Sequence, residues 1–210
     1  MQIFTDLDGV LIDTSERSYS VYETILRKHG LPSLEKGVFL ELKRQKVPLT
    51  ELLARTGDQN LPESFKKEWL ENIETAASLR HDRLFEHTVD TLQKLAARYA
   101  LYLVTLRKKP ELLVEELDRF GIKNMFTDIL VGSEEGAGHE SKIQKMEILA
   151  KPGDIMVGDS ETDIRAGKGL GMITIAVENG WRSRELLEKE SPDYFIGSIS
   201  ELLTLPVFSP

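Results

Sequence analysis

The stretch FTDLDGV, residues 4–10, places two carboxylates two positions apart, where the apolar run of residues 1–4 stops and Gly9 lets the chain turn. Side chains two apart on an extended segment point to the same side, so Asp6 and Asp8 would crowd one small space without a positive group between them. A Mg²⁺ ion and an incoming phosphate supply such a group, because Mg²⁺ prefers oxygen ligands and often binds through one or two carboxylates plus substrate phosphate. A surface turn is the alternative, since Asp-Gly is also a common hairpin sequence.

Three downstream segments favour the first interpretation. The apolar run of residues 101–104 ends at Thr105, the pair Ser141 and Lys142 opens a basic segment, and IMVGDSETD, residues 155–163, closes the set. In this order the four segments resemble the motifs of the haloacid dehalogenase-like hydrolase superfamily, which are an Asp-x-Asp, a Ser or Thr, a Lys or Arg, and a Gly-Asp with a further Asp nearby. The resemblance spans nearly the whole chain.

Bulk composition excludes several classes of protein. With 35 acidic and 27 basic residues and a net charge of −8, the 210-residue chain has no basic stripe for a nucleic-acid backbone. It has no cysteine, no run of membrane-spanning length, and no N-terminal signal-peptide pattern. We therefore expect a cytoplasmic protein whose partner is a small phosphorylated substrate, with neither nucleic acid nor membrane as a partner, and we leave open a monomer or a homodimer.

Hydrophobic periodicity predicts an α/β fold, a Rossmann-like parallel sheet with helices on both faces. The candidate strands are residues 2–5, 100–105, 128–131, 154–158, 172–177 and 194–196, and the amphipathic segments between them include 88–98, 110–120, 142–150 and 161–169. Ligands of such sheets bind beyond the carboxyl ends of the strands. Since Asp6, Thr105 and Asp159 each fall at such an end, we expect them to converge.

Residues 14–80 interrupt the strand and helix alternation. Apolar residues between 21 and 26 repeat at helical spacing, Gly30 is a plausible helix stop, and residues 48–56 and 62–77 also have helical patterns. The family resemblance implies that this segment is an inserted all-helical cap. We therefore predict an α/β core made of residues 1–13 and 81–210.

The resemblance also implies a role for each carboxylate of the first motif. Asp6 would be the nucleophile, because an aspartate in line with phosphorus can form an aspartyl-phosphate and divide one displacement into two. A Mg²⁺ ligand without covalent chemistry is the alternative role for Asp6. Asp8 would be the general acid and base. Dehalogenase members lack this second Asp, so its presence disfavours dehalogenase activity.

The phosphate-binding positions follow from the second and third motifs. Thr105 would offer its hydroxyl, and the following amides, starting at Leu106, would offer N–H donors to the phosphoryl oxygens. Relatives usually carry a small or polar residue after this Thr, whereas Leu106 and Arg107 follow here. Arg107 is either a compensating cation that contributes to specificity or a solvated side chain.

The third motif supplies the cation. Ser141 has the spacing of a capping box, which would place Lys142 in the first turn of a helix, with Lys145 as the rival cation.

The last motif would complete a Mg²⁺ site. Asp159 is expected to be a direct ligand alongside Asp6 and the backbone carbonyl of Asp8. Asp163 would fall at the third position of the next helix, where a carboxylate either supports the metal through water or only caps the helix.

Together these residues predict a Mg²⁺-dependent phosphatase that acts on a small phosphorylated metabolite, similar to the helical-capped branch with phosphoglycolate phosphatases. The basic stretch Lys43, Arg44 and Lys46 is the candidate specificity element of the cap, unless it is a solvated helix face. A phosphomutase resembling β-phosphoglucomutase shares all four motifs and is the first alternative. A catalytically silent regulatory or binding module is the second, disfavoured by the intact motif set.

Overall fold

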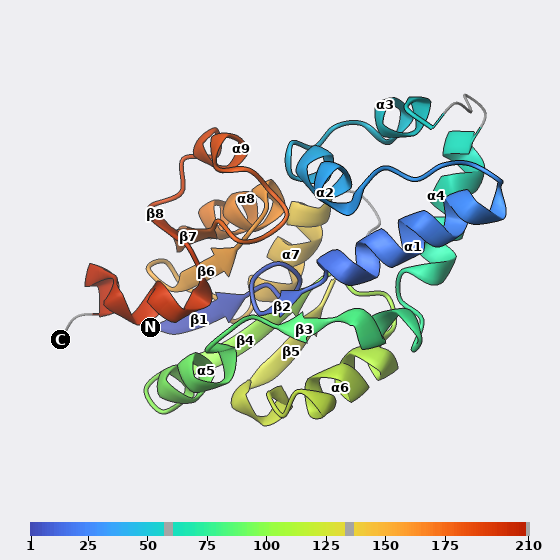
Figure 1. The fold of residues 1–210 in the computed structure, drawn as a ribbon. Helices are drawn as coiled ribbons and strands as arrows, with labels where there is room; N and C mark the ends of the chain where they lie inside the picture. The colour runs from blue at the N-terminus through green and yellow to red at the C-terminus, as the bar shows by residue number, and fades with distance from the viewer. Residues whose placement is uncertain (57–60, 133–136, 209–210) are drawn as a thin grey trace. The chain divides into compact units, whose positions relative to one another are not determined.

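The computed structural model describes residues 1–56, 61–132 and 137–208 (Figure 1), and the chain divides into two compact units. The first consists of Met1–Asp13 with Leu84–Pro210, and the second of Thr14–Arg83. A two-stranded sheet pairs β2 (Ile12–Asp13) with β3 (Arg83–Leu84), where the chain passes between the units. Each unit is described by itself below.

The first unit is built on a six-stranded sheet with the strand order β5-β4-β1-β6-β7-β8, in which every pairing is parallel. This confirms the predicted Rossmann-like parallel sheet. In spatial order the strands are β5 (Asp128–Val131), β4 (Ala100–Thr105), β1 (Gln2–Thr5), β6 (Ile155–Gly158), β7 (Ile173–Val177) and β8 (Tyr194–Ile196). The strands that end at or just before Thr105, Asp6 and Asp159, namely β4, β1 and β6, are therefore direct neighbours.

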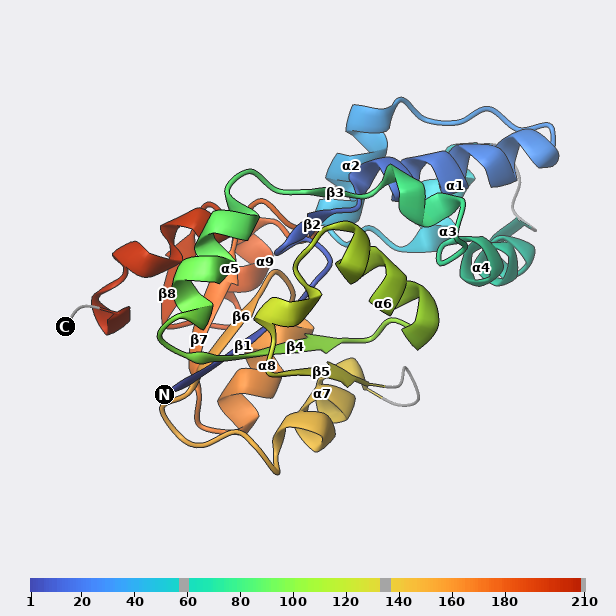
Figure 2. The same cartoon turned by 90° about the horizontal axis from the view of Figure 1, so that it is seen from below.

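Successive side chains of β1 enter two different cores, because strand side chains alternate between the faces of a sheet. Ile3 packs in one core with leucines of α5 (Thr88–Ala96) and α6 (Pro110–Arg119). Phe4 packs in the other with residues of α7 (Gly138–Met146) and α8 (Glu161–Gly169). Figure 2 shows these two helix pairs on opposite sides of the sheet. The remaining helices of this unit are η2 (Lys123–Met125), α9 (Arg184–Glu188), η3 (Ile199–Thr204) and η4 (Pro206–Phe208).

The described part of the second unit is helical up to β3. Its helices are α1 (Ser15–Lys28), α2 (Lys36–Arg44), α3 (Leu49–Ala54), α4 (Leu61–Asn72) and η1 (Ser78–His81). A stacked pair, Tyr22 on α1 and Phe39 on α2, has a centroid separation of 4.4 Å and lies in the core of this unit. Gly30 has a φ of +70° just beyond α1 and stops the helix as predicted. The helix predicted over 62–77 is shorter, since α4 ends at Asn72.

Among the described residues, no helix combines the length and the apolar character that a bilayer crossing requires.

Candidate active site

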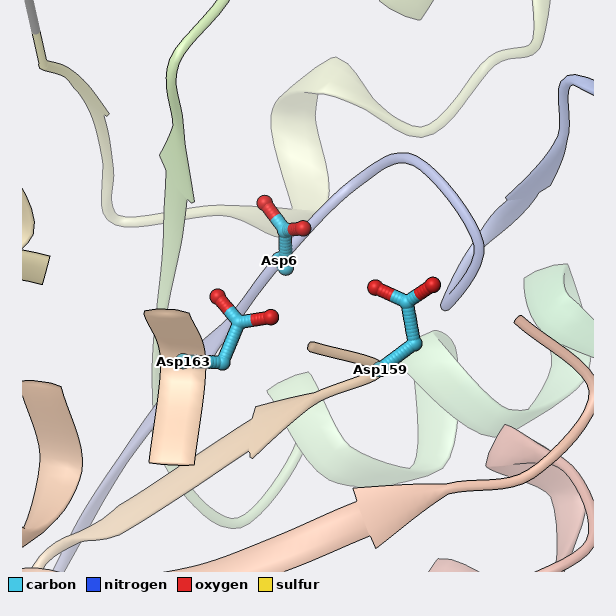
Figure 3. Close-up of side chains that lie close together, drawn as sticks. All are labelled: Asp6, Asp159 and Asp163. Atoms are coloured by element: carbon cyan, nitrogen blue, oxygen red, sulfur yellow. The ribbon is translucent and has the colours of Figure 1, made fainter. Parts of the chain in front are cut away.

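Asp6 and Asp159 follow neighbouring strands at the same edge of the sheet. Thr5 of β1 lies opposite Val157 of β6, and the backbone N–H of Asp6 donates to the carbonyl of Val157 at 2.9 Å. Each aspartate therefore leaves its strand at a similar height. Asp6, Asp159 and Asp163 each offer a carboxylate oxygen within 4.8 Å of the others, and Figure 3 shows the three side chains facing a common space. The predicted convergence of Asp6 and Asp159 is present in the structure.

Asp163 both caps a helix and joins this cluster. It is the third residue of α8, as predicted, and its Oδ2 accepts hydrogen bonds from the backbone N–H of Ser160 at 3.1 Å and from the Ser160 hydroxyl at 2.6 Å. Its Oδ1 accepts from Lys142 Nζ at 2.6 Å. The capping role fixes the carboxylate, so that one oxygen holds the helix start while the other faces the site.

Lys142 is the buried cation of the site. Its Nζ donates to Asp6 Oδ1 at 2.7 Å, to Asp163 Oδ1 at 2.6 Å and to the carbonyl of Val104 at 3.2 Å. Its side chain is 2% exposed, whereas Lys145, the rival cation one turn along the helix, is exposed to solvent. The structure therefore brings Lys142 to Asp6 and leaves Lys145 at the surface.

The predicted helix start at Ser141 is wrong. Helix α7 begins at Gly138, and the Ser141 N–H already donates to the carbonyl of Ala137 at 3.2 Å, so Ser141 lies inside the helix and is not its cap. Lys142 consequently stands beyond the first turn, where a cation meets less of the positive end of the helix dipole.

Burial and mutual repulsion dominate the electrostatics of the cluster. The pKa of Asp6 is raised to about 7, chiefly by burial; attraction to Lys142 opposes the rise and repulsion from Asp163 adds to it. Burial, followed by repulsion from Asp163 and Asp6, also raises the pKa of Asp159 well above its ordinary value. Burial alone would lower the pKa of Lys142, but attraction to Asp163 and Asp6 outweighs it, so that this pKa is raised.

The donor set of this cluster fits a divalent cation such as Mg²⁺. In the described part of the chain, three carboxylates share this space with the Lys142 ammonium group, so a divalent cation would offset the burial and the repulsion that raise the pKa values of Asp6 and Asp159. All three side chains offer oxygen, the ligand atom that Mg²⁺ prefers.

Glycines around Asp159 leave room for its carboxylate. A Cβ atom on Gly9 would lie 2.1 Å from Asp159 Oδ2, and one on Gly180 would lie 2.2 Å from the same atom. Gly9 also has a φ of +80°, in the region that favours glycine. The backbone N–H of Trp181 donates to Asp159 Oδ2. Sequence reasoning missed this donor, although Gly180 directly before it was the available signal of a close backbone approach.

The residues at the end of β4 and directly after it, Thr105 and Leu106, lie at the same edge of the sheet as Asp6. Thr105 is buried at the end of the strand, and its hydroxyl oxygen accepts the backbone N–H of Arg107 at 3.3 Å. The side chain of Leu106 packs against Gly132 and Gly138, where a Cβ atom would lie 2.7 Å and 3.0 Å from its methyl carbons. Leu106 is thus accommodated by glycine. The phosphate-binding roles of Thr105 and Leu106 stay predictions.

Arg107 is buried and contacts Asp8, so the alternative of a solvated side chain is wrong. Its Nε and Nη2 donate to Asp8 Oδ2 and Oδ1, each at 2.7 Å, and its Nη2 also donates to Glu116 Oε2 at 3.2 Å. The Arg107 side chain is 4% exposed. Sequence reasoning missed Glu116, which is an ordinary acidic residue of an amphipathic helix until the fold is known.

The basic stretch lies in the second unit, at the end of α2. Lys43 and Arg44 are partly buried there, and Lys46 follows with a φ of 56°. The Nζ of Lys43 stands 5.4 Å from the ring centroid of Trp69, so its charge interacts with an aromatic face of its own unit. The specificity role of these residues stays a prediction.

The sequence matches the family described as haloacid dehalogenase-like hydrolase over residues 3–177. The chain belongs to this family. It is 29% identical to the pyrophosphatase PpaX of Bacillus mycoides, over 97% of this chain and 95% of that protein. It is 26% identical to a phosphoglycolate phosphatase of Vibrio parahaemolyticus, again over 97% and 95% of the two chains. The chain is therefore a hydrolase, and its relatives place it with the phosphatases of the family.

The fold itself is also shared with solved structures of the family. A haloacid dehalogenase-like family hydrolase from Streptococcus pneumoniae superimposes with a TM-score of 0.80, at 23% identity, over 97% of this chain and 96% of that one. The matched residues include parts of both units of the chain.

Proposed function

We propose that this chain hydrolyses the phosphate ester or anhydride of a small metabolite through a covalent phosphoryl group on Asp6, with Mg²⁺ as cofactor. The observation that carries the proposal is the buried contact between Lys142 Nζ and Asp6 Oδ1 at 2.7 Å, inside a cluster completed by Asp159 and Asp163. The buried ammonium of Lys142 donates hydrogen bonds to two carboxylates, Asp6 and Asp163, at the carboxyl edge of the parallel sheet. A cation in this position can neutralise the charge of a phosphoryl group bound there.

The chain's own residues account for both chemical steps. A carboxylate oxygen of Asp6 attacks phosphorus, the bond from phosphorus to the leaving oxygen breaks, and Asp8 gives that oxygen its proton. Asp8 then takes a proton from water, the water oxygen attacks phosphorus, and the Asp6 carboxylate leaves as inorganic phosphate forms. Lys142 holds Asp6 Oδ1, which orients the second oxygen for attack and neutralises charge near the phosphoryl group.

Asp6, Asp159 and the backbone carbonyl of Asp8 would hold the Mg²⁺ ion, with Asp163 supporting it through water. When bound, the ion supplies positive charge to the phosphoryl oxygens. The raised pKa values of Asp6 and Asp159 are consistent with this assignment, because burial and then repulsion between neighbouring carboxylates raise them, and a bound cation would oppose both effects.

The substrate we propose is small and anionic. The named relatives act on pyrophosphate and on phosphoglycolate by their printed names, and both compounds carry negative charge beyond the transferred phosphoryl group. We propose that residues 14–80 act as the cap and that Lys43, Arg44 and Lys46 attract that remaining charge.

A Mg²⁺-dependent phosphate-release screen tests the catalytic proposal. The panel contains pyrophosphate, phosphorylated organic acids, sugar phosphates and nucleotides, each with Mg²⁺ and with a chelator. We expect Asp6→Asn to abolish turnover while the protein stays folded, and Asp90→Asn, a change of an exposed carboxylate on α5, to leave turnover intact. Near-native kcat in Asp6→Asn would refute the nucleophile assignment. Absence of phosphate release from every compound in the wild type would favour a silent binding module.

The same assay separates a phosphatase from a phosphomutase. With a sugar 1-phosphate and a catalytic amount of the bisphosphate, we expect inorganic phosphate to accumulate. Accumulation of the isomeric 6-phosphate with little free phosphate would overturn the choice of a phosphatase.

The specificity proposal is tested by neutralising Lys43, Arg44 and Lys46 to glutamine. We expect a higher KM for an anionic substrate and little change for a generic aryl phosphate, with an effect on the order of 1 kcal/mol per charge that weakens in high salt. Lys67→Gln, on the exposed surface of α4, is the matched control. Equal changes in KM for both substrates would contradict the specificity role and leave the three residues as solvated surface residues.

A further inference from the structure

We propose that Arg107, itself held by Glu116, is a positioning residue that fixes the carboxylate of Asp8 for proton transfer. The inference rests on the proposed function, because it concerns the residue assigned there as general acid and base. It assigns positioning roles to two residues outside the four motifs: Arg107 holds Asp8, and Glu116 on α6 holds Arg107.

The topology brings Asp8 and Arg107 together. Strands β1 and β4 are parallel neighbours in which Thr5 lies opposite Leu103. Asp8 stands three residues beyond Thr5 and Arg107 stands four residues beyond Leu103, so both leave the sheet at the same edge and at similar height. Strand register therefore brings the two backbone segments to the same edge of the sheet.

The contact between them constrains direction as well as distance. Two parallel hydrogen bonds of 2.7 Å join the planar guanidinium to both oxygens of the Asp8 carboxylate. Such a bidentate pair sets the plane of the carboxylate, whereas a lysine would offer a point charge around which a carboxylate can rotate. The geometry thus selects arginine at this position.

Glu116 anchors the guanidinium through Nη2, the nitrogen that also donates to Asp8 Oδ1. Its side chain is 1% exposed, and its Oε2 accepts from Arg107 Nη2 at 3.2 Å, while its Oε1 accepts from Arg119 Nη2 at 3.1 Å. Helix α6 begins with Pro110 three residues after Arg107, which keeps the connection between Arg107 and its anchor short. The Arg107 guanidinium therefore has little rotational freedom. Because Glu116 lies on α6, the packing of this helix fixes Arg107, and Arg107 in turn fixes the carboxylate of Asp8.

Exact placement matters most for a substrate whose leaving oxygen needs a proton. Proton donation by a positioned side chain contributes roughly 10²–10⁴-fold, and a misplacement of about 1 Å can cost on the order of 10²-fold. An alkyl phosphate has a poorly stabilised leaving oxygen and depends on this donation. A 4-nitrophenyl phosphate has a stabilised leaving oxygen and depends on it far less. Loss of positioning therefore predicts a loss of rate that varies with the leaving group.

The test measures kcat/KM, which reports the step that expels the leaving group, for an alkyl phosphate that the enzyme accepts and for 4-nitrophenyl phosphate. We expect Arg107→Met to lower kcat/KM for the alkyl ester by about 100-fold and for the nitrophenyl ester by less than about 5-fold. Arg107→Lys should recover only part of the loss. Glu115→Gln is the matched control on α6, because Glu115 is exposed to solvent one position before Glu116, and it should leave both values near those of the wild type.

Two further variants keep the proposal decidable. Glu116→Gln retains Arg107 and loosens its anchor, so it should show the same leaving-group pattern at smaller amplitude even where Arg107→Met is poorly folded. In an Asp8→Asn background, removing Arg107 should add little further loss. Equal losses for both esters in folded Arg107→Met and Glu116→Gln, or no loss in either, would overturn the positioning role. An Asp8→Asn variant without a leaving-group-dependent loss would instead overturn the proposed function.

Discussion

In the metal-free protein, stability should fall as the pH rises from about 4 to about 7. The folded state raises the pKa of Asp6 from 3.8 to about 7, chiefly by burial, with repulsion from Asp163 opposed by Lys142. Between these two values the folded chain holds a proton on Asp6 that the unfolded chain has released. Stability from this group is therefore complete below the unfolded pKa and is lost as the pH passes through the folded pKa.

The magnitude follows from the size of the shift. A difference of about 3 pKa units corresponds to an upper limit of about 4 kcal/mol, or roughly 10 °C in the unfolding midpoint of a chain of this length. Mg²⁺ should remove most of this dependence, because a cation between the carboxylates favours the ionised form of Asp6. The stabilisation by Mg²⁺ is thus expected to be larger at pH 8 than at pH 5.

Thermal unfolding from pH 5 to pH 8, with a chelator and with saturating Mg²⁺, measures both effects. Asp6→Asn is the matched control, because the amide has a similar size and does not titrate in this range. Its metal-free midpoint should decline less with pH than that of the wild type. Equal slopes for the wild type and Asp6→Asn in the metal-free state would refute the assignment of the buried charge to Asp6.

Two other substitutions test the packing of the site. Lys142→Met should cost about 3–5 kcal/mol in urea unfolding, because it leaves buried carboxylates without their cation, whereas Lys145→Met, at the exposed rival position, should change stability by less than about 0.5 kcal/mol. Gly180→Ala should weaken Mg²⁺ binding measured by calorimetry, since the added methyl group would meet the Asp159 carboxylate at 2.2 Å. Unchanged affinity would show that Asp159 can move without loss of the site.

The sheet could be predicted from the sequence because its central strands β4, β1, β6 and β7 are short apolar runs whose residues are mostly buried on both faces. The run of residues 100–105 coincides with β4, and the run of residues 154–158 exceeds β6 by one residue. Since parallel strands present their carboxyl ends at one edge, the meeting of Asp6 and Asp159 followed from the order of the runs alone. That part of the site needed no side-chain detail.

The remaining features depend on contacts that the local sequence does not encode. The start of α7 was misplaced because Ser141 and Gln144 have the spacing of a cap, while the structure begins the helix at Gly138. The contact of Arg107 with Asp8 joins residues 99 positions apart, and an arginine after a strand carries no local mark of burial. Such contacts become predictable only after the strand order is known.

The buried cluster carries more carboxylate charge than ammonium charge, and this excess predicts the order in which the metal ion and the substrate bind. Lys142 satisfies part of the charge of Asp6 and Asp163, while Asp159, which accepts from the backbone N–H of Trp181, faces the same space. A phosphate that approached this surface alone would meet net repulsion, whereas a divalent cation would meet attraction. The cation should therefore arrive first and the phosphorylated compound second, so that the enzyme follows compulsory-order kinetics in which the metal gates entry of the anion.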